Sequence, residues 1–70
     1  MSLAKVIQVV ATSPNGWQEA VDDAVKRASK TVRNISAIHI ESWNAKVRQG
    51  KIVEYRAVIN IAFEVEKVRG

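Results

Sequence analysis

The sequence predicts an α+β fold in which a three-stranded antiparallel sheet wraps one helix. Apolar residues alternate along 53–65, which indicates a strand, and recur at helical spacing along 16–32, which indicates a helix. Glycine and asparagine at turn positions separate these segments. With 70 residues, we expect a single domain over residues 1–70. The expected order is strand, helix, strand, strand.

Residues 4–12 are rich in β-branched side chains and are predicted to form the first strand. Apolar residues lie on both of its faces, so we expect both faces to be covered. The turn sequence "SPNG" follows, and Ser13, Asn15 or Gly16 caps the next helix.

Residues 16–32 are predicted to form the helix. Its apolar stripe consists of Trp17, Ala20, Val21, Ala24, Val25, Ala28 and Val32. The opposite side is charged, and Asp23 and Arg27 have the spacing of a helical ion pair. Because the stripe is mostly alanine and valine, the helix can lie close to a sheet. Asn34, just after it, suits the left-handed conformation.

Residues 35–47 are predicted to form the second strand, whose apolar pattern changes phase. Either a β-bulge near Glu41–Ser42 shifts the phase, or the two halves of the strand bury opposite faces. Gly50, in the loop 48–50, supplies the positive-φ residue of a hairpin, and the third strand runs over 51–66. A right-handed crossover then pairs the first strand with the third, which gives the strand order 1-3-2.

The predicted helix is too short to cover the hairpin. A helix of ~17 residues is ~25 Å long, whereas a strand of ~15 residues is ~50 Å long. The outer hairpin therefore leaves an apolar surface with no partner in its own chain. These expected interface residues are Trp43, Val47, Ile52, Val53 and Tyr55. Exposed apolar patches mark interfaces, so we expect a closed homo-oligomer in which the chain's partner is itself.

The composition argues against several other kinds of protein. The chain has no cysteine and one histidine, which excludes disulfides and a multi-histidine metal site within one chain. No apolar stretch approaches the roughly 18 residues of a membrane span, and no signal peptide is recognisable, so we expect a cytoplasmic protein without a membrane partner. The net charge of +4 comes from scattered basic residues, so we do not expect nucleic acid as the partner.

The sequence contains little that suggests catalysis. His39 would have to serve as the base, but no acid lies at a spacing that orients it. The strand carboxylates either pair with Lys and Arg across the sheet or, in a symmetric oligomer, converge around a hard cation. These carboxylates are Glu41, Glu54, Glu64 and Glu66. Trp43 is either an interface anchor or a stacking platform for a planar ligand such as flavin.

Three motifs together resemble the dodecin family: T-S-P-x-x-W-x-x-A at 12–20, A-x-K-T-x-R-N at 28–34 and G-K-x-x-E-Y-R at 50–56. The resemblance extends over nearly the whole chain. It implies a hollow assembly of twelve identical subunits with the helices outward. It also implies a non-catalytic role, because the best-known members bind riboflavin or FMN between subunits and serve as flavin stores.

The resemblance also implies where a flavin would bind, and different residues occupy those positions here. Ala37 stands where flavin-binding members have the stacking tryptophan, and Arg56 stands where they have a glutamine that hydrogen-bonds the ring. We add Trp43 and His39 to this flavin-equivalent set. Ala37 offers no π-face, whereas Arg56 could meet a phosphate or stack on a ring itself. The chain therefore resembles the subgroup that lacks the tryptophan. For that subgroup the alternative to flavin binding is a structural role, or the binding of a divalent cation such as calcium or of an anionic ligand other than flavin.

Overall fold

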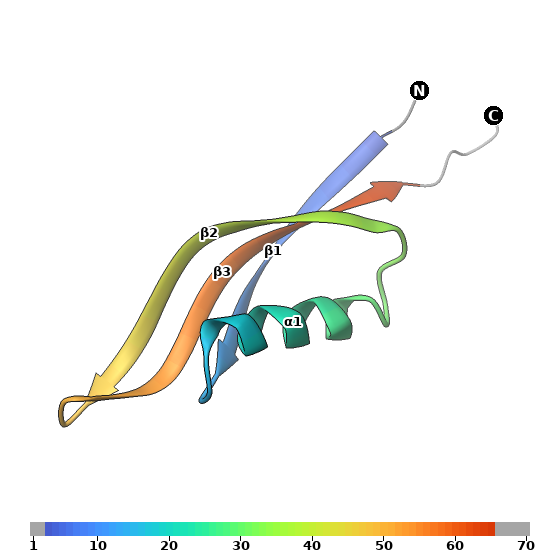
Figure 1. The fold of residues 1–70 in the computed structure, drawn as a ribbon. Helices are drawn as coiled ribbons and strands as arrows, with labels where there is room; N and C mark the ends of the chain where they lie inside the picture. The colour runs from blue at the N-terminus through green and yellow to red at the C-terminus, as the bar shows by residue number, and fades with distance from the viewer. Residues whose placement is uncertain (1–2, 66–70) are drawn as a thin grey trace, which may run out of the picture.

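The computed structural model describes residues 3–65. They form β1 (Leu3–Ser13), α1 (Trp17–Ala28), β2 (Ile35–Arg48) and β3 (Lys51–Val65). The sheet has the order β1-β3-β2 with antiparallel neighbours, and α1 lies against one face of this strongly bent sheet (Figure 1). The predicted α+β fold and the strand order 1-3-2 are confirmed. The predicted last residue of the third strand, Glu66, lies outside the described residues.

The helix begins at Trp17 and ends at Ala28, four residues before its predicted end. Gly16 is the N-cap residue, and it has no side chain with which to bond the first turn. At the other end, the Ser29 hydroxyl donates a hydrogen bond to the Val25 carbonyl, and residues 29–31 form a turn. Serine competes for backbone carbonyls in this way, which weakens the helix at that point. Asn34 then adopts the predicted left-handed conformation, with φ of 64°.

The core lies between α1 and the centre of β3. Ala57, Ile59 and Ile61 are 0% exposed and contact Val21 of the helix. The predicted apolar stripe of α1 packs against them, as do side chains of the flanking strands. Because β3 is the central strand, its helix-facing residues are covered on both sides as well as from above.

Of the two alternatives that the sequence left open for the second strand, β2 has the bulge. The pairing with β3 shifts between Ile40 and Ser42, so that Glu41 is the additional residue. Ile40 pairs with Ile59 before the shift, and Trp43 pairs with buried Ala57 after it. Both halves of the strand therefore turn their apolar residues toward the helix side of the sheet, which excludes the alternative in which they bury opposite faces.

Gln49 and Gly50 form the hairpin turn between β2 and β3. Their φ angles are 53° and 76°, respectively. A two-residue turn with positive φ at both positions matches the right-handed twist of the strands. The positive φ predicted for Gly50 is confirmed, and Gln49 shares it although glutamine has a Cβ that disfavours this conformation.

Part of the sheet has no cover within the chain. Val6 and Val10 on β1 are 61% and 60% exposed, so the expected second cover of this strand is not supplied by the same chain. The Cα radius of gyration is 14.8 Å and the longest dimension is 58 Å. A compact chain of this length has a radius of gyration of about 11 Å. The chain is thus too extended to cover its own apolar surface.

Candidate functional site

The face of the sheet opposite α1, here called the helix-free face, carries three of the four predicted ligand residues, Ala37, His39 and Arg56, and two of these lie at distant points. Ala37 pairs with Ala62 on β3, whereas Arg56 of β3 pairs with Thr12 and Asn44. Ala62 and Arg56 are six residues apart on one strand, which corresponds to ~20 Å. Ala37 and Arg56 therefore share a face but cannot hold the same small ligand within one chain. A second copy of the chain is needed to bring them together.

Trp43 lies on the opposite face of the sheet from Ala37 and Arg56. Its ring meets that of Trp17 edge to face, with centroids 6.0 Å apart. Trp17 makes a similar contact with Tyr55 at 4.8 Å, and its Nε1 donates a hydrogen bond to the Asn44 carbonyl at 2.9 Å. The prediction that Trp43 and Tyr55 have no partner in the same chain is wrong, because the side chain of Trp17, at the start of α1, reaches both.

The outer part of the hairpin, residues 43–57, is here called the hairpin arm, and it extends past the start of α1 (Figure 1). Its helix side is apolar, and its exposed large side chains are Trp43, Val47, Ile52 and Val53. Trp43 is 51% and Val47 61% exposed despite their apolar character. Four of the five predicted interface residues are thus exposed, while Tyr55 is half-buried.

The helix-free face offers no large aromatic ring within residues 3–65. The cross-strand pairings put Trp43 and Tyr55 on the helix side. Phe63 lies two residues after buried Ile61 on β3, so it faces the helix side as well. The imidazole of His39 is the ring that remains on the helix-free face. The described residues therefore do not fit a flavin that stacks on tryptophan, although the Arg56 guanidinium fits an anionic group.

A polar row crosses the helix-free face near its centre. Gln8, Asn60 and His39 are cross-strand neighbours in this row. The Gln8 Nε2 donates to Asn60 Oδ1 at 3.0 Å, and the Asn60 Nδ2 donates to Glu41 Oε1 at 3.3 Å. The bulge thus lets Glu41 join a row to which regular alternation would not bring it. Within residues 3–65, no three potential metal ligands lie together, so a metal site would need more than one chain.

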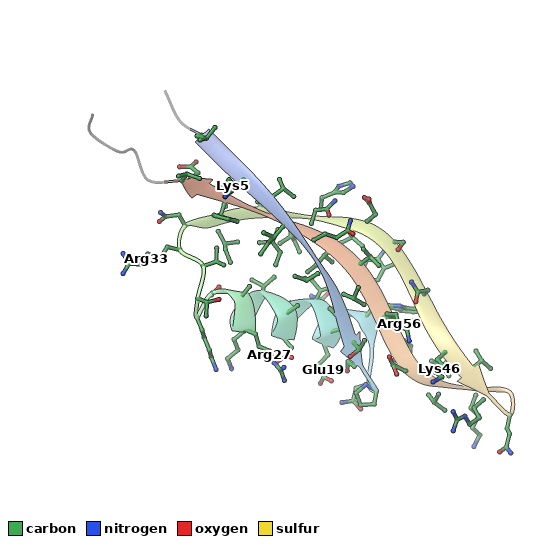
Figure 2. The ribbon with its side chains drawn as sticks, turned by 180° about the vertical axis from the view of Figure 1, so that it is seen from behind. Lys5, Glu19, Arg27, Arg33, Lys46 and Arg56 are labelled. Carbon is green, nitrogen blue, oxygen red and sulfur yellow. The ribbon has the colours of Figure 1, made fainter. Side chains whose placement is uncertain are left out.

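The helix-free side of the hairpin arm is basic. Lys46 pairs with Glu54, and Arg48 pairs with Lys51 beside the turn. The Arg56 guanidinium contacts the Glu54 carboxylate at 3.3 Å. Figure 2 shows Lys46 and Arg56 on this outer part of the hairpin, away from Arg27 and Arg33. Basic residues that are scattered in the sequence therefore share this side, because Lys46 and Arg48 alternate along β2 and the pairing shift between Lys46 and Val47 puts Lys51 opposite Arg48.

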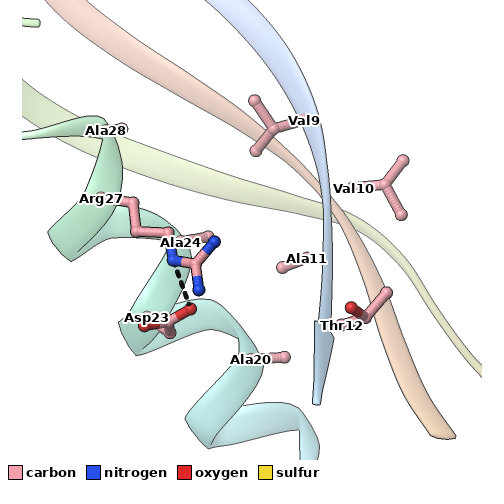
Figure 3. A pocket seen from close by; sticks show the side chains of 9 residues that line it. All are labelled: Val9, Val10, Ala11, Thr12, Ala20, Asp23, Ala24, Arg27 and Ala28. Carbon is pink, nitrogen blue, oxygen red and sulfur yellow. Dashed lines mark ion pairs between the residues drawn. The ribbon is translucent and has the colours of Figure 1, made fainter. Parts of the chain in front are cut away.

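A groove of about 400 Å³ runs between α1 and the edge strand β1. Its floor consists of small side chains such as Ala11, Ala20 and Ala24, and its rim carries Asp23 and Arg27 (Figure 3). The predicted ion pair between these two side chains is present, at 3.1 Å. The two charged groups of the rim are therefore engaged with each other.

The connection from β1 to α1 is held by a small polar cluster. The buried Ser13 hydroxyl donates to Glu19 Oε1 at 2.5 Å and accepts from the Asn15 amide at 3.0 Å. The Asn15 side-chain amide also donates to Glu19. These bonds stabilise the carboxylate and lower the pKa of Glu19, with the Ser13 bond contributing most. Ser13 therefore acts through Glu19 rather than as the helix cap.

No described helix is long and apolar enough to cross a membrane.

The family model for dodecins matches residues 3–66 of this chain. Calcium dodecin of Mycobacterium tuberculosis is 31% identical over 65 residues, which are 93% of this chain and 92% of that protein. The crystal structure of that calcium dodecin, described as having a novel calcium-binding site, has a TM-score of 0.80 and covers 99% of both chains. The structure of dodecin from Streptomyces coelicolor, at 28% identity, has a TM-score of 0.89 and covers 96% of both chains.

Proposed function

Since this chain belongs to the dodecin family, we propose that it is the non-catalytic subunit of a hollow homododecamer that binds a small ligand between subunits. The observation that carries this proposal is the hairpin arm. It leaves Trp43, Val47 and Ile52 exposed on one side of a chain that is too extended to cover them. Apolar surface of this kind is stabilised by burial against another copy. The cytoplasmic location expected from the sequence is part of the same proposal.

The ligand site of this assembly would combine the Ala37 region of one chain with the Arg56 region of another. Family membership makes a flavin the first candidate, as riboflavin or FMN. The ring has no tryptophan on which to stack, but Arg56 can pair with the phosphate that FMN carries and riboflavin lacks. We therefore expect this protein to prefer FMN to riboflavin.

Calcium is the second candidate, because the relative from Mycobacterium tuberculosis bears the name calcium dodecin. Calcium takes six to eight oxygen ligands. Glu41 supplies a carboxylate that Asn60 already orients on the helix-free face. Symmetry-related copies of Glu41 would have to converge to complete such a site, which again requires assembly.

The proposal assigns no reaction to the chain. His39 lies in the polar row, and the Glu41 carboxylate in that row accepts a hydrogen bond from Asn60. A histidine that acts as a general base needs an acid or a carbonyl that fixes its tautomer, and Glu41 bonds Asn60 instead. Storage or buffering of a ligand requires no such arrangement.

The first experiment titrates the assembled protein with FMN and with riboflavin and measures flavin fluorescence. A second titration adds calcium and measures the melting temperature. FMN that binds at least about tenfold more tightly than riboflavin would support the phosphate-contacting site. Equal quenching of both flavins would contradict the role of Arg56. A calcium-dependent rise in melting temperature without flavin binding would favour the second candidate. Assembled protein that responds to none of them would contradict ligand binding.

A further inference from the structure

The hairpin arm has two chemically different sides. The helix side carries the apolar residues Trp43, Val47 and Ile52, and alternation along β2 turns Lys46 and Arg48 the other way. The pairing with β3 shifts between Lys46 and Val47, so that Glu54 and Lys51 lie opposite Lys46 and Arg48 on that same side. The charged residues on that side are Lys46, Arg48, Lys51, Glu54 and Arg56. This set of four cations and one acid is here called the basic side of the arm. Its net charge of +3 compares with +4 for the whole chain.

The charges on the basic side are only partly compensated. Glu54 pairs with Lys46 across the strands and contacts Arg56 at 3.3 Å. Arg48 and Lys51 face each other directly beside the turn, and neither forms an ion pair within residues 3–65. Like charges that lie directly opposite in a sheet destabilise it. An anion bound between Arg48 and Lys51 would relieve this repulsion.

The spacing of the cations suits an anion with more than one charged group. Arg48 with Lys51, Lys46 with Glu54, and Arg56 with Asn44 occupy successive positions on the same side. Such positions are separated by ~7 Å along a strand. Asn44 and Thr12, the cross-strand partners of Arg56, add neutral hydrogen-bonding groups at the inner end. Arginine binds phosphate through two parallel hydrogen bonds, and lysine binds it as a point charge.

From this placement we propose that the basic side of the hairpin arm binds a small anion with two or more phosphate groups, for which pyrophosphate is the simplest probe. The inference rests on the proposed function in that burial of the apolar side in an assembly leaves Lys46, Arg48 and Lys51 of the basic side accessible. It goes beyond the flavin-equivalent position, because Lys46, Arg48 and Lys51 contribute as well as Arg56.

The experiment titrates pyrophosphate into the assembled protein by calorimetry, at low and at physiological salt. We expect binding that weakens as salt rises, because the contacts are exposed and electrostatic. The double variant Arg48→Gln/Lys51→Gln should bind about tenfold more weakly or worse, since it loses two charge-assisted contacts. The control Lys26→Gln/Lys30→Gln removes two exposed cations from the helix side of the chain and should bind within about twofold of the wild type.

Light scattering of each sample separates this proposal from that of assembly. An assembled wild type that gives no pyrophosphate heat would overturn the anion site and leave the shell intact. Equal loss of binding in both double variants would overturn it too, since the effect would then follow net charge alone. A thymidine oligonucleotide is titrated in parallel. Binding of the oligonucleotide without binding of pyrophosphate would make the arm a nucleic-acid surface and overturn the proposal.

Discussion

The indole nitrogen of Trp17 donates a hydrogen bond to the main-chain oxygen of Asn44, and the two atoms are 2.9 Å apart. These residues are 27 positions apart in the chain. The bond joins the first residue of the helix to the base of the hairpin arm. The rings of Trp43 and Tyr55 meet the same indole edge to face. One side chain therefore links the start of the helix to both strands of the hairpin arm.

Replacing Trp17 with phenylalanine removes the hydrogen bond and keeps an aromatic ring. We expect Trp17→Phe to lower the free energy of unfolding by about 1 kcal/mol, the net value of one such bond. Urea denaturation followed by circular dichroism measures this difference. Trp43→Phe is the matched control, since the indole of Trp43 has the same size and the described contact involves only its ring. A larger loss in the control would contradict the assigned role of Trp17.

The side chain of Ile59 is 0% exposed at the centre of the core. Ile59→Ala should destabilise the subunit by about 2–5 kcal/mol through lost burial and a residual cavity. A core of this size supplies only about 3–5 kcal/mol, so the variant should fold only as far as assembly supports it. Thermal melting at several protein concentrations tests this. Ile59→Val provides a graded control with an expected loss of about 0.5–1.5 kcal/mol, and indistinguishable melting of the two variants would contradict the position of the core.

The hydrogen bonds from Ser13 and Asn15 lower the pKa of Glu19 from its ordinary value of 4.5. A carboxylate with a depressed pKa in the folded state stabilises the fold above its unfolded pKa, and this contribution is lost as the pH falls through the folded pKa. The wild type should therefore melt at a higher temperature than Glu19→Gln at neutral pH, and the difference should shrink below pH 4.5. A difference that stays constant down to strongly acidic pH would contradict this linkage.

A second variant tests the cause of the same pKa shift. Ser13 makes the largest contribution, so Ser13→Ala should raise the pKa of Glu19 toward its ordinary value. A carbon-detected NMR titration of the Glu19 carboxyl reports this directly. Gln18→Ala changes a neighbouring exposed residue whose amide bonds Asp22 instead, and it should leave the Glu19 titration as in the wild type.

Ala37 stands at the position that the resemblance assigns to a flavin-stacking ring. Ala37→Trp should therefore create or strengthen quenching of riboflavin fluorescence, because it adds a π-face to the helix-free face. Thr31→Trp adds the same ring at an exposed turn after α1 and should not quench. If the two variants quench equally, Ala37 does not border a ligand site.

The sequence predicts the elements well because each has a strong local signal. The phase change in residues 38–43 predicts either a bulge or two halves that bury opposite faces, and the structure has the bulge. Gly50 predicts the turn, because few other residues readily adopt a positive φ. The predicted end of the helix was wrong by four residues. Apolar Val32 continues the helical spacing in the sequence, whereas the helix ends at Ala28, where the Ser29 hydroxyl bonds the Val25 carbonyl.

The candidate site was less predictable, because it depends on which side of the sheet each residue faces. Trp43 and His39 are close in sequence to Ala37, yet the bulge puts Trp43 on the other face. The reach of Trp17 to the hairpin arm joins residues 27 apart, for which no local pattern exists. The basic side of the arm follows from strand pairing, which becomes visible only once the register is known.

The central claim is that other copies of the chain cover the apolar side of the hairpin arm. Light scattering of the purified protein at micromolar concentration tests this claim most directly. The test variant Val47→Glu puts a charge on the apolar side of the arm, and the control variant Gln49→Glu puts the same charge at the turn. The account predicts a wild-type mass near that of twelve copies of 7.8 kDa, about 94 kDa, retained in Gln49→Glu and lost in Val47→Glu. A stably folded wild-type monomer of 7.8 kDa would contradict it.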